Sequence, residues 1–261
     1  MSFKELTYEV DGHVGVITLN RPEAMNSLTY TLYMELEDAV RQSQARALVI
    51  TGTGRAFCAG DDVKQILGGN AAPPPESIER GRKTGGLTPA ADALLYTDIP
   101  VIAAVNGPAI GWGMELALMA DIRVASEKAR FAELFVVRGL CSDAPGLGRL
   151  AQLVGRERAA ELLFTGEIID AAKAKEIGLV SRVVPPEQLM PTALEIASKI
   201  AANPPLAVKA LKAGLRRTLD PDWRDVGKWA IGEIQRLRKT EDSIESVRSF
   251  IEKREPKFVG R

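Results

Sequence analysis

The chain has 261 residues, of which 46% are apolar and 26% charged, so it can bury the core of one large domain. Lysine plus arginine equals aspartate plus glutamate at 34 each, and this balance favours neither nucleic acid nor an anionic membrane as a partner. The N-terminus lacks an apolar signal core, and the most apolar run, near residues 101–120, contains Asn106, Pro108 and Glu115. We therefore expect a soluble, cytoplasmic protein.

The first third of the sequence predicts two strands, a helix and a third strand. Residues 8–10 and 14–19 flank an Asp-Gly turn, and residues 29–42 have helical spacing. Residues 68–89 contain three consecutive prolines and five glycines. For this stretch we expect a mobile loop over the mouth of a site, without a contribution to the core.

The rest of the chain alternates helices and strands before becoming purely helical. We expect helices at 90–96, 156–164 and 171–177, a cap at Gly178, and strands at 122–125 and 179–184. From Leu189 onward the strand pattern stops. Helical spacing then predicts helices over 192–202, 205–218, 223–239 and 243–253.

Two stretches share one design, residues 47–67 (ALVITGTGRAFCAGDDVKQIL) and residues 100–121 (PVIAAVNGPAIGWGMELALMAD). Each is an apolar strand that ends at a glycine-bearing loop, after which a helical pattern begins. The first N–H groups of a helix lack internal partners and lie at the positive end of its dipole. Two helix starts could therefore hold one developing oxyanion.

The sequence lacks the residue motifs of several other kinds of site. The only histidine, His13, lies in a polar turn between two strands, and no G-x-S-x-G elbow occurs, so a serine triad is excluded. Zinc motifs are absent, and neither glycine loop matches a nucleotide-phosphate fingerprint, so we expect no metal site. Cys58 and Cys141 are too few for a disulfide framework, and we interpret them as small buried residues.

The two stretches and their flanks resemble the crotonase superfamily, the enoyl-CoA hydratase/isomerase family. The resemblance is carried by LNRPEAMNSL, AFCAGDDVK, PVIAAVNGPAIGWGMELALMADIRVAS, LFTGEIIDAAKAKEIGLVSRVV and FIEKREPKF. It implies an α/β fold, a spiral of ββα units over residues 1–190 with the active site, followed by a helical region at 191–261. By the same resemblance this region builds a homotrimer or a dimer of trimers. Trp223 and Trp229 are candidate anchors of that interface, since buried aromatic residues often dominate interfaces. Helical spacing alone leaves open that these helices only cap their own core.

The resemblance also implies the substrate, a coenzyme A thioester, with no cofactor beyond the coenzyme A moiety. In the family two backbone N–H groups hold the thioester oxygen as it gains enolate charge, and they map to Asp61 and Trp112. Residues expected along coenzyme A and the thioester are Glu23, Met25, Ser27, Ala59, Asp62 and Lys64. Lys253 or Lys257 could meet the phosphates, although surface lysines are usually only solvated charges.

The acid-base residues differ from the hydratase pattern. Hydratases of the family use two glutamates around one water, and the first maps to Glu115, one turn into the second helix. The second maps to Phe135, which cannot exchange a proton. Glu133, two residues earlier, could fill this role only if the alignment slips, and we interpret it as a solvent-facing strand residue.

An aspartate, Asp143, follows eight residues after Phe135, where ordinary hydratases commonly have glycine and some isomerases, hydrolases and dehalogenases of the superfamily have aspartate. Apolar neighbours would raise its pKa and make it a better proton acceptor. An Asx-type turn before Pro145 is the competing interpretation. The sequence thus favours double-bond isomerisation with Asp143 as base. Hydration through Glu115, thioester hydrolysis and a degenerate coenzyme A ester-binding protein remain alternatives.

Overall fold

The computed structural model describes residues 3–67 and 72–261, and its centre is a six-stranded sheet. The strand order is β1-β2-β3-β4-β6-β9, in which β1 pairs antiparallel with β2 and every other pair is parallel. The strands are β1 (Leu6–Asp11), β2 (Val14–Leu19), β3 (Ala47–Gly52), β4 (Val101–Val105), β6 (Ile122–Ser126) and β9 (Arg182–Val184). The parallel pairs need crossover connections, and the helices between them provide these connections.

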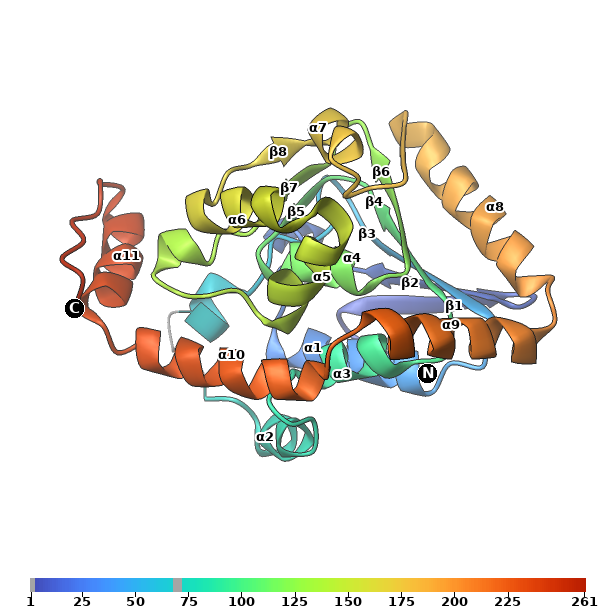
Figure 1. Ribbon diagram of the computed structural model, residues 1–261, viewed down its shortest axis with the longest axis horizontal. Helices are drawn as coiled ribbons and strands as arrows, with labels where there is room; N and C mark the ends of the chain where they lie inside the picture. Colours follow the sequence, from blue (N-terminus) through green and yellow to red (C-terminus); the bar gives the residue numbers. More distant parts are fainter. Residues whose placement is uncertain (1–2, 68–71) are drawn as a thin grey trace.

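Alternate side chains of the sheet enter two different cores. On one face, Val49 and Ile102 pack under helix α8 (Leu189–Ala201) with its alanines Ala193 and Ala197. On the other face, Leu48 and the remaining inward residues pack with helices α1 (Tyr30–Arg41), α3 (Pro89–Tyr96) and α4 (Trp112–Met119). Figure 1 shows α8 alone along one side of the sheet and the other helices across from it. The central strands β3 and β4 are therefore buried on both faces, as is usual for parallel sheets.

A second sheet carries the later part of the core. It consists of β5 (Pro108–Ile110), β7 (Arg130–Ala132) and β8 (Ile169–Asp170), with β5 and β7 parallel and β8 antiparallel to β7. Around it lie α5 (Ala144–Val154), α6 (Arg156–Thr165) and α7 (Ala171–Glu176). Short helical turns occur at η1 (Pro22–Ala24), η2 (Val63–Leu67), η3 (Val136–Arg138) and η4 (Pro186–Gln188).

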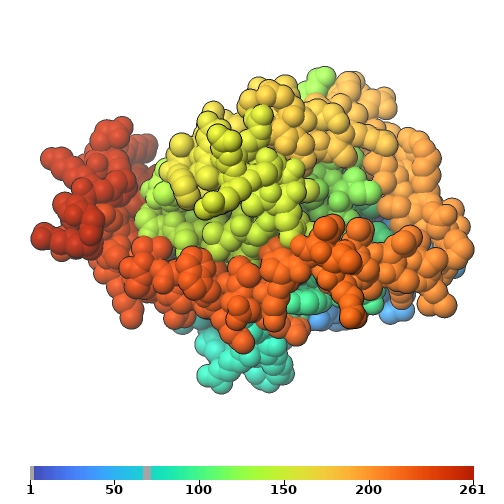
Figure 2. Space-filling view, viewed as in Figure 1, coloured from blue at the N-terminus to red at the C-terminus, as the bar shows by residue number. Residues whose placement is uncertain are grey.

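The C-terminal helices run along one edge of the molecule and end in a separate lobe. Helices α9 (Pro205–Leu219) and α10 (Trp223–Leu237) form the edge, and α11 (Glu241–Glu252) forms the lobe beside the C-terminus (Figures 1 and 2). Trp223 is fully buried within the chain, and a Cβ atom on Gly148 of α5 would lie 2.7 Å from its ring. Trp223 was expected as an anchor between subunits; instead it attaches α10 to the chain's own core.

Most of the predicted helices and strands are confirmed, with bounds that differ by at most three residues. The stretch 68–89 was wrongly interpreted as a loop, because α2 (Pro75–Arg82) lies within it and projects from the body (Figure 2). Arg80 of α2 forms ion pairs with Glu37 and Asp38 of α1, which explains how so polar a segment is fixed. Residues 68–71 of that stretch lie outside the described part. The division at residue 190 stays a prediction.

Candidate active site

Two loops meet at the ends of β3 and β5, and backbone contacts lock them together. Cys58 and Ala109 form an isolated parallel β-bridge, and the Ile110 N–H donates to the Cys58 carbonyl at 3.0 Å. A Cβ atom at Gly113 would lie 2.0 Å from that same carbonyl oxygen, and one at Gly60 would lie 2.7 Å from the Ile110 oxygen. Only glycine permits this approach, which the two glycine-bearing stretches of the sequence predicted.

The backbone N–H groups of Asp61 and Trp112 come to the junction of these loops. In the described part of the chain, neither N–H has a hydrogen-bond acceptor. Trp112 is the first residue of α4, so its N–H is one of those that the helix leaves unpaired. Asp61 precedes a single π-helical turn, η2, which is shorter than the helix expected there. Two unpaired donors at one junction could hold an oxyanion.

The aromatic pair Tyr33 and Trp112 packs beside this junction. Tyr33 and Trp112 pack edge to face, with ring centroids 4.7 Å apart. The Tyr33 hydroxyl donates to Asp61 Oδ1 at 2.7 Å. The Asp61 carboxylate does not cap the following turn; the Asp62 carboxylate accepts the N–H groups of Lys64 and Gln65 instead. Burial raises the pKa of Asp61, against the opposing hydrogen bond from Tyr33.

Asp143 begins helix α5 and lies beside this junction. Its carboxylate accepts from the Ala144 N–H at 3.3 Å, so it is the N-cap of a helix rather than an isolated turn residue. Burial, followed by the negative charge of Asp61, raises the pKa of Asp143 to about 6, while the Ala144 N–H and the Trp112 side chain oppose the rise. The side chain nevertheless keeps partial contact with solvent.

Glu115 lies in the first turn of α4 and points across to the start of α5. Its two oxygens accept the N–H groups of Asp143 at 2.9 Å and Gly146 at 2.7 Å. The carboxylate thus caps a neighbouring helix and not its own. Burial raises the pKa of Glu115 well above its usual range, and the charges of Glu133 and Asp143 add to the rise against the two N–H donors.

Glu133 is a buried member of this carboxyl group, contrary to the expectation of a solvent-facing strand residue. It is fully buried just after β7 and accepts the Ser142 hydroxyl at 3.2 Å. Its Oε1 has no partner among the described residues. Burial raises its pKa well above the usual range, and the Ser142 hydrogen bond opposes the rise. Glu133 is not a strand residue, because β7 ends at Ala132 and Glu133 lies in the segment that leads to η3.

A small cavity of about 110 Å³, which we name the inner cavity, opens at the two unpaired N–H groups. Phe135 lies on its wall, and a Cβ atom at Gly111 would lie 3.9 Å from the Phe135 ring. The lining residues are Ala59, Gly60, Asp61, Val63, Ile110, Gly111, Trp112, Leu134, Phe135, Arg138 and Leu140. The wall is therefore mostly apolar around a pair of backbone donors.

Comparison with known proteins identifies the class of enzyme. The family model described as enoyl-CoA hydratase/isomerase matches residues 9–261. The chain belongs to the enoyl-CoA hydratase/isomerase family. It is 38% identical to a short-chain-enoyl-CoA hydratase of Clostridium acetobutylicum, with 97% of each chain covered, and 37% identical to a probable enoyl-CoA hydratase of Rhizobium meliloti, with 100% of each covered.

A solved structure agrees with the fold of this family member. The crystal structure of an enoyl-CoA hydratase/isomerase from Pseudoalteromonas atlantica is 32% identical, covers 98% of this chain and all of its own, and superposes with a TM-score of 0.89. The chain is thus a crotonase-fold enzyme of the family that acts on enoyl-CoA thioesters. Among the described helices, none is long and apolar enough to cross a membrane.

The residues expected along coenzyme A lie on one side of the 59–62 loop. Ala59 lines the inner cavity, and its N–H donates to the Met25 carbonyl at 3.0 Å. Ser27 and Asp62 share hydrogen bonds with the Arg21 guanidinium, so both are already engaged. Glu23 and Lys64 are exposed side chains near that loop. These contacts leave the assigned roles as predictions.

The sequence interpretation missed two residues of this enzyme's site, Tyr33 and Arg138, and placed a third, Glu133, on the wrong side. Tyr33 is one residue of an ordinary amphipathic helix, and nothing in its pattern distinguishes it. Glu133 and Arg138 follow the end of β7, where no regular spacing indicates direction. The sequence signal for Glu133 is its place two residues before Phe135, the position to which the family's second glutamate maps.

Proposed function

We propose that the enzyme shifts the double bond of an enoyl-CoA thioester, with Asp143 as the base. The Asp143 carboxylate removes a proton from the carbon between the thioester carbonyl and the double bond. The released electron pair delocalises onto the thioester oxygen, and the N–H groups of Asp61 and Trp112 stabilise that dienolate. Asp143 then returns the proton to the far end of the diene system, so the double bond becomes conjugated with the carbonyl and no atom is gained or lost.

The observation that carries this proposal is Phe135 on the wall of the inner cavity. Hydration needs a second carboxyl group to activate water at this place, according to the family pattern. A phenyl ring supplies no such group and lowers the polarity around any water. Proton transfer along one carbon chain needs only one base.

The hydrogen bonds of Glu115 support the choice of Asp143. Both Glu115 oxygens accept backbone N–H groups, so this carboxylate is held toward α5. The Asp143 carboxylate accepts one backbone N–H, that of Ala144, and interacts with the Trp112 side chain, and it keeps partial exposure. With a pKa of about 6 it is mostly deprotonated at neutral pH and still basic enough to accept a proton from carbon.

Hydration through Glu115 is the second candidate, because the two relatives described above are named as hydratases. In that case Glu115 would orient the water, and the buried Glu133, whose charge acts on Glu115, would be the second carboxyl group. Thioester hydrolysis is a further outcome, and a coenzyme A ester-binding protein without turnover is another. Isomerisation, hydration and hydrolysis give different products, and binding without turnover gives none.

Mass spectrometry of product mixtures tests the proposal. The enzyme is incubated separately with a 3-enoyl-CoA and with the matching 2-enoyl-CoA. We expect the 3-enoyl thioester to give an isomer of equal mass, and the 2-enoyl thioester to gain no water. A gain of water as the main reaction would show a hydratase, release of free coenzyme A a hydrolase, and no product at all a binding protein; each result contradicts isomerisation.

We also infer a homotrimer or a dimer of trimers, in which α9 faces a second copy of the chain. Lys212 and Arg216 hold the inner face of α9 through ion pairs with Asp121 at 2.8 Å and Asp98 at 2.6 Å. The outer face is apolar, with exposed leucines at positions 211, 215 and 219 that are 59 to 70% accessible. Such a contiguous apolar face on a soluble helix is typical of an interface. A cytoplasmic location and the absence of a further cofactor belong to the same proposal.

A further inference from the structure

A larger cavity of about 550 Å³, which we name the outer cavity, continues from the inner one. Arg138 and Leu140 line both cavities, so the two share a wall. The outer cavity lies between η3, the end of α10 and α11, and its lining residues are Ile66, Arg138, Leu140, Arg238, Ser243, Ile244, Val247, Arg248, Ile251 and Glu252. Its volume is that of a site for a small organic ligand.

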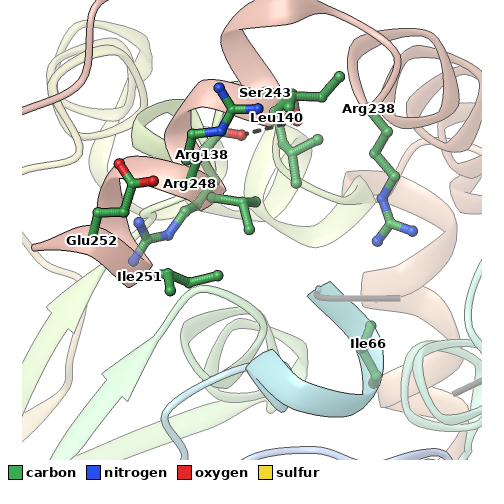
Figure 3. A pocket seen from close by; sticks show the side chains of 10 residues that line it. Ile66, Arg138, Leu140, Arg238, Ser243, Arg248, Ile251 and Glu252 are labelled. Atoms are coloured by element: carbon green, nitrogen blue, oxygen red, sulfur yellow. Dashed lines mark hydrogen bonds between the residues drawn. The ribbon is translucent and has the colours of Figure 1, made fainter. Parts of the chain in front are cut away.

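Three guanidinium groups surround this otherwise apolar space. Figure 3 shows Arg238 across the opening from Arg138 and Arg248, with Ile66 and Ile251 at its border. Among the described residues, none of these three arginines forms an ion pair or a side-chain hydrogen bond. The one carboxylate on the lining, Glu252, is bound by Arg254 at 2.6 Å. The cavity therefore has an excess of positive charge.

The arginine nearest to the inner cavity is held in place. The Arg138 guanidinium lies 4.1 Å from the centroid of the Phe250 ring, an arrangement of a cation over an aromatic face. Half-burial lowers its pKa, which is the sign of a charge that has lost water without gaining a partner. An anion that entered the cavity would supply that partner.

Arg238 connects the two cavities electrostatically. Its positive charge lowers the pKa of the Asp61 carboxyl, against the larger effect of burial, so its field reaches the unpaired N–H group of Asp61. Residues 23–27, expected along coenzyme A, are absent from the lining of the outer cavity. A thioester held in the inner cavity can therefore extend its acyl chain toward the arginines.

We propose that the outer cavity selects acyl-CoA substrates whose acyl chain ends in a carboxylate, which Arg138, Arg238 and Arg248 bind, while the apolar side chains of Leu140, Ile244 and Ile251 contact the methylene groups. This inference rests on the proposed function only in placing the thioester in the inner cavity. Guanidinium groups bind carboxylates through paired, charge-assisted hydrogen bonds, and an apolar surrounding strengthens them. A methyl-ended chain leaves all three charges without a partner.

Equilibrium binding of two unreactive thioesters tests the inference without any turnover. Adipoyl-CoA and hexanoyl-CoA have the same chain length and differ in the terminal carboxylate. Calorimetry on the full chain is expected to show adipoyl-CoA bound at least about tenfold more tightly, the usual worth of charge-assisted hydrogen bonds. Equal or weaker binding of adipoyl-CoA would overturn the inference, whatever reaction the enzyme catalyses.

Variants identify the residues responsible. The double variant Arg238→Met/Arg248→Met should abolish the preference for adipoyl-CoA and leave the affinity for hexanoyl-CoA and for free coenzyme A unchanged. Lys239→Met removes the same charge from an exposed neighbour outside the cavity lining and should keep the preference. An equal loss for all three ligands would show that the arginines bind the phosphates of coenzyme A, which contradicts the inference. A preference retained in the double variant, once circular dichroism shows it folded, also contradicts it.

Discussion

The carboxylate of Glu115 accepts the backbone N–H of Asp143 at 2.9 Å, so these two acidic residues are joined through a main-chain hydrogen bond. The second Glu115 oxygen accepts the Gly146 N–H at 2.7 Å. Together these bonds fix the first turn of α5 and therefore the position of the Asp143 side chain. Glu115 is thus a positioning residue in the isomerisation that we propose.

Glu115→Gln should destabilise the fold, because an amide has one acceptor oxygen and two backbone donors compete for it. The unpaired buried N–H costs about 1 to 3 kcal/mol in the free energy of unfolding. Chemical denaturation of this variant beside Glu167→Gln, an exposed control, measures the difference. Equal stability of the two variants would show that the hydrogen bonds to α5 contribute nothing.

The acid limb of the pH profile should follow Asp143. A base acts only when deprotonated, and the pKa of Asp143 is raised to about 6 by burial and by Asp61. We expect kcat/KM to be constant at neutral pH and to fall about tenfold per pH unit below that value. Trp112→Phe removes a contact that lowers this pKa, so the limb should move to higher pH. A profile that stays flat down to pH 4 would exclude Asp143 as the base.

Trp112→Pro should remove one donor to the thioester oxygen and keep the helix, because proline is well tolerated at the first position of a helix. Loss of such a donor elsewhere lowers turnover by roughly 100- to 1,000-fold. Trp112→Phe keeps the N–H and controls for the lost indole. If a folded Trp112→Pro enzyme turned over like Trp112→Phe, the assignment of this donor would be wrong.

Charges on the outer face of α9 should dissociate the assembly. Leu211→Glu combined with Leu215→Glu places two carboxylates on the exposed apolar face, at a cost of several kcal/mol per interface. Light scattering at micromolar concentration should give a trimer or hexamer for the wild type and a monomer for the variant. Arg217→Glu, on another face of α9, is the control. A monomeric wild type would contradict the inferred interface.

The sequence predicted the parts of the site that depend on the backbone. Glycine loops followed by helix starts indicated where Asp61 and Trp112 lie, because a close approach such as that of Gly113 to Cys58 permits no side chain. It could not predict the directions of side chains after β7, where Glu133 turns inward. Nor did composition reveal α2, which depends on ion pairs with α1 that are distant in sequence. Contacts with other segments of the chain determine both the direction of Glu133 and the position of α2.

The exposed tryptophan and the buried one illustrate the same limit. Trp223 and Trp229 share a helix and were equal candidates for an interface. Trp223 is fully buried against α5, whereas Trp229 is 58% accessible. Periodicity places both on the helix, but only the position of α5 decides which face is covered.

Exchange of deuterium from solvent into the carbon next to the thioester tests the central claim most directly. It reports removal of the proton itself, independent of product release, and it can be followed by mass spectrometry in Asp143→Asn and Glu115→Gln side by side. We predict that Asp143→Asn lowers exchange by a factor of about 100 to 10,000, the usual worth of a positioned base, and that Glu115→Gln lowers it less. Exchange that persists in Asp143→Asn and disappears in Glu115→Gln would contradict the assignment of Asp143 as the base.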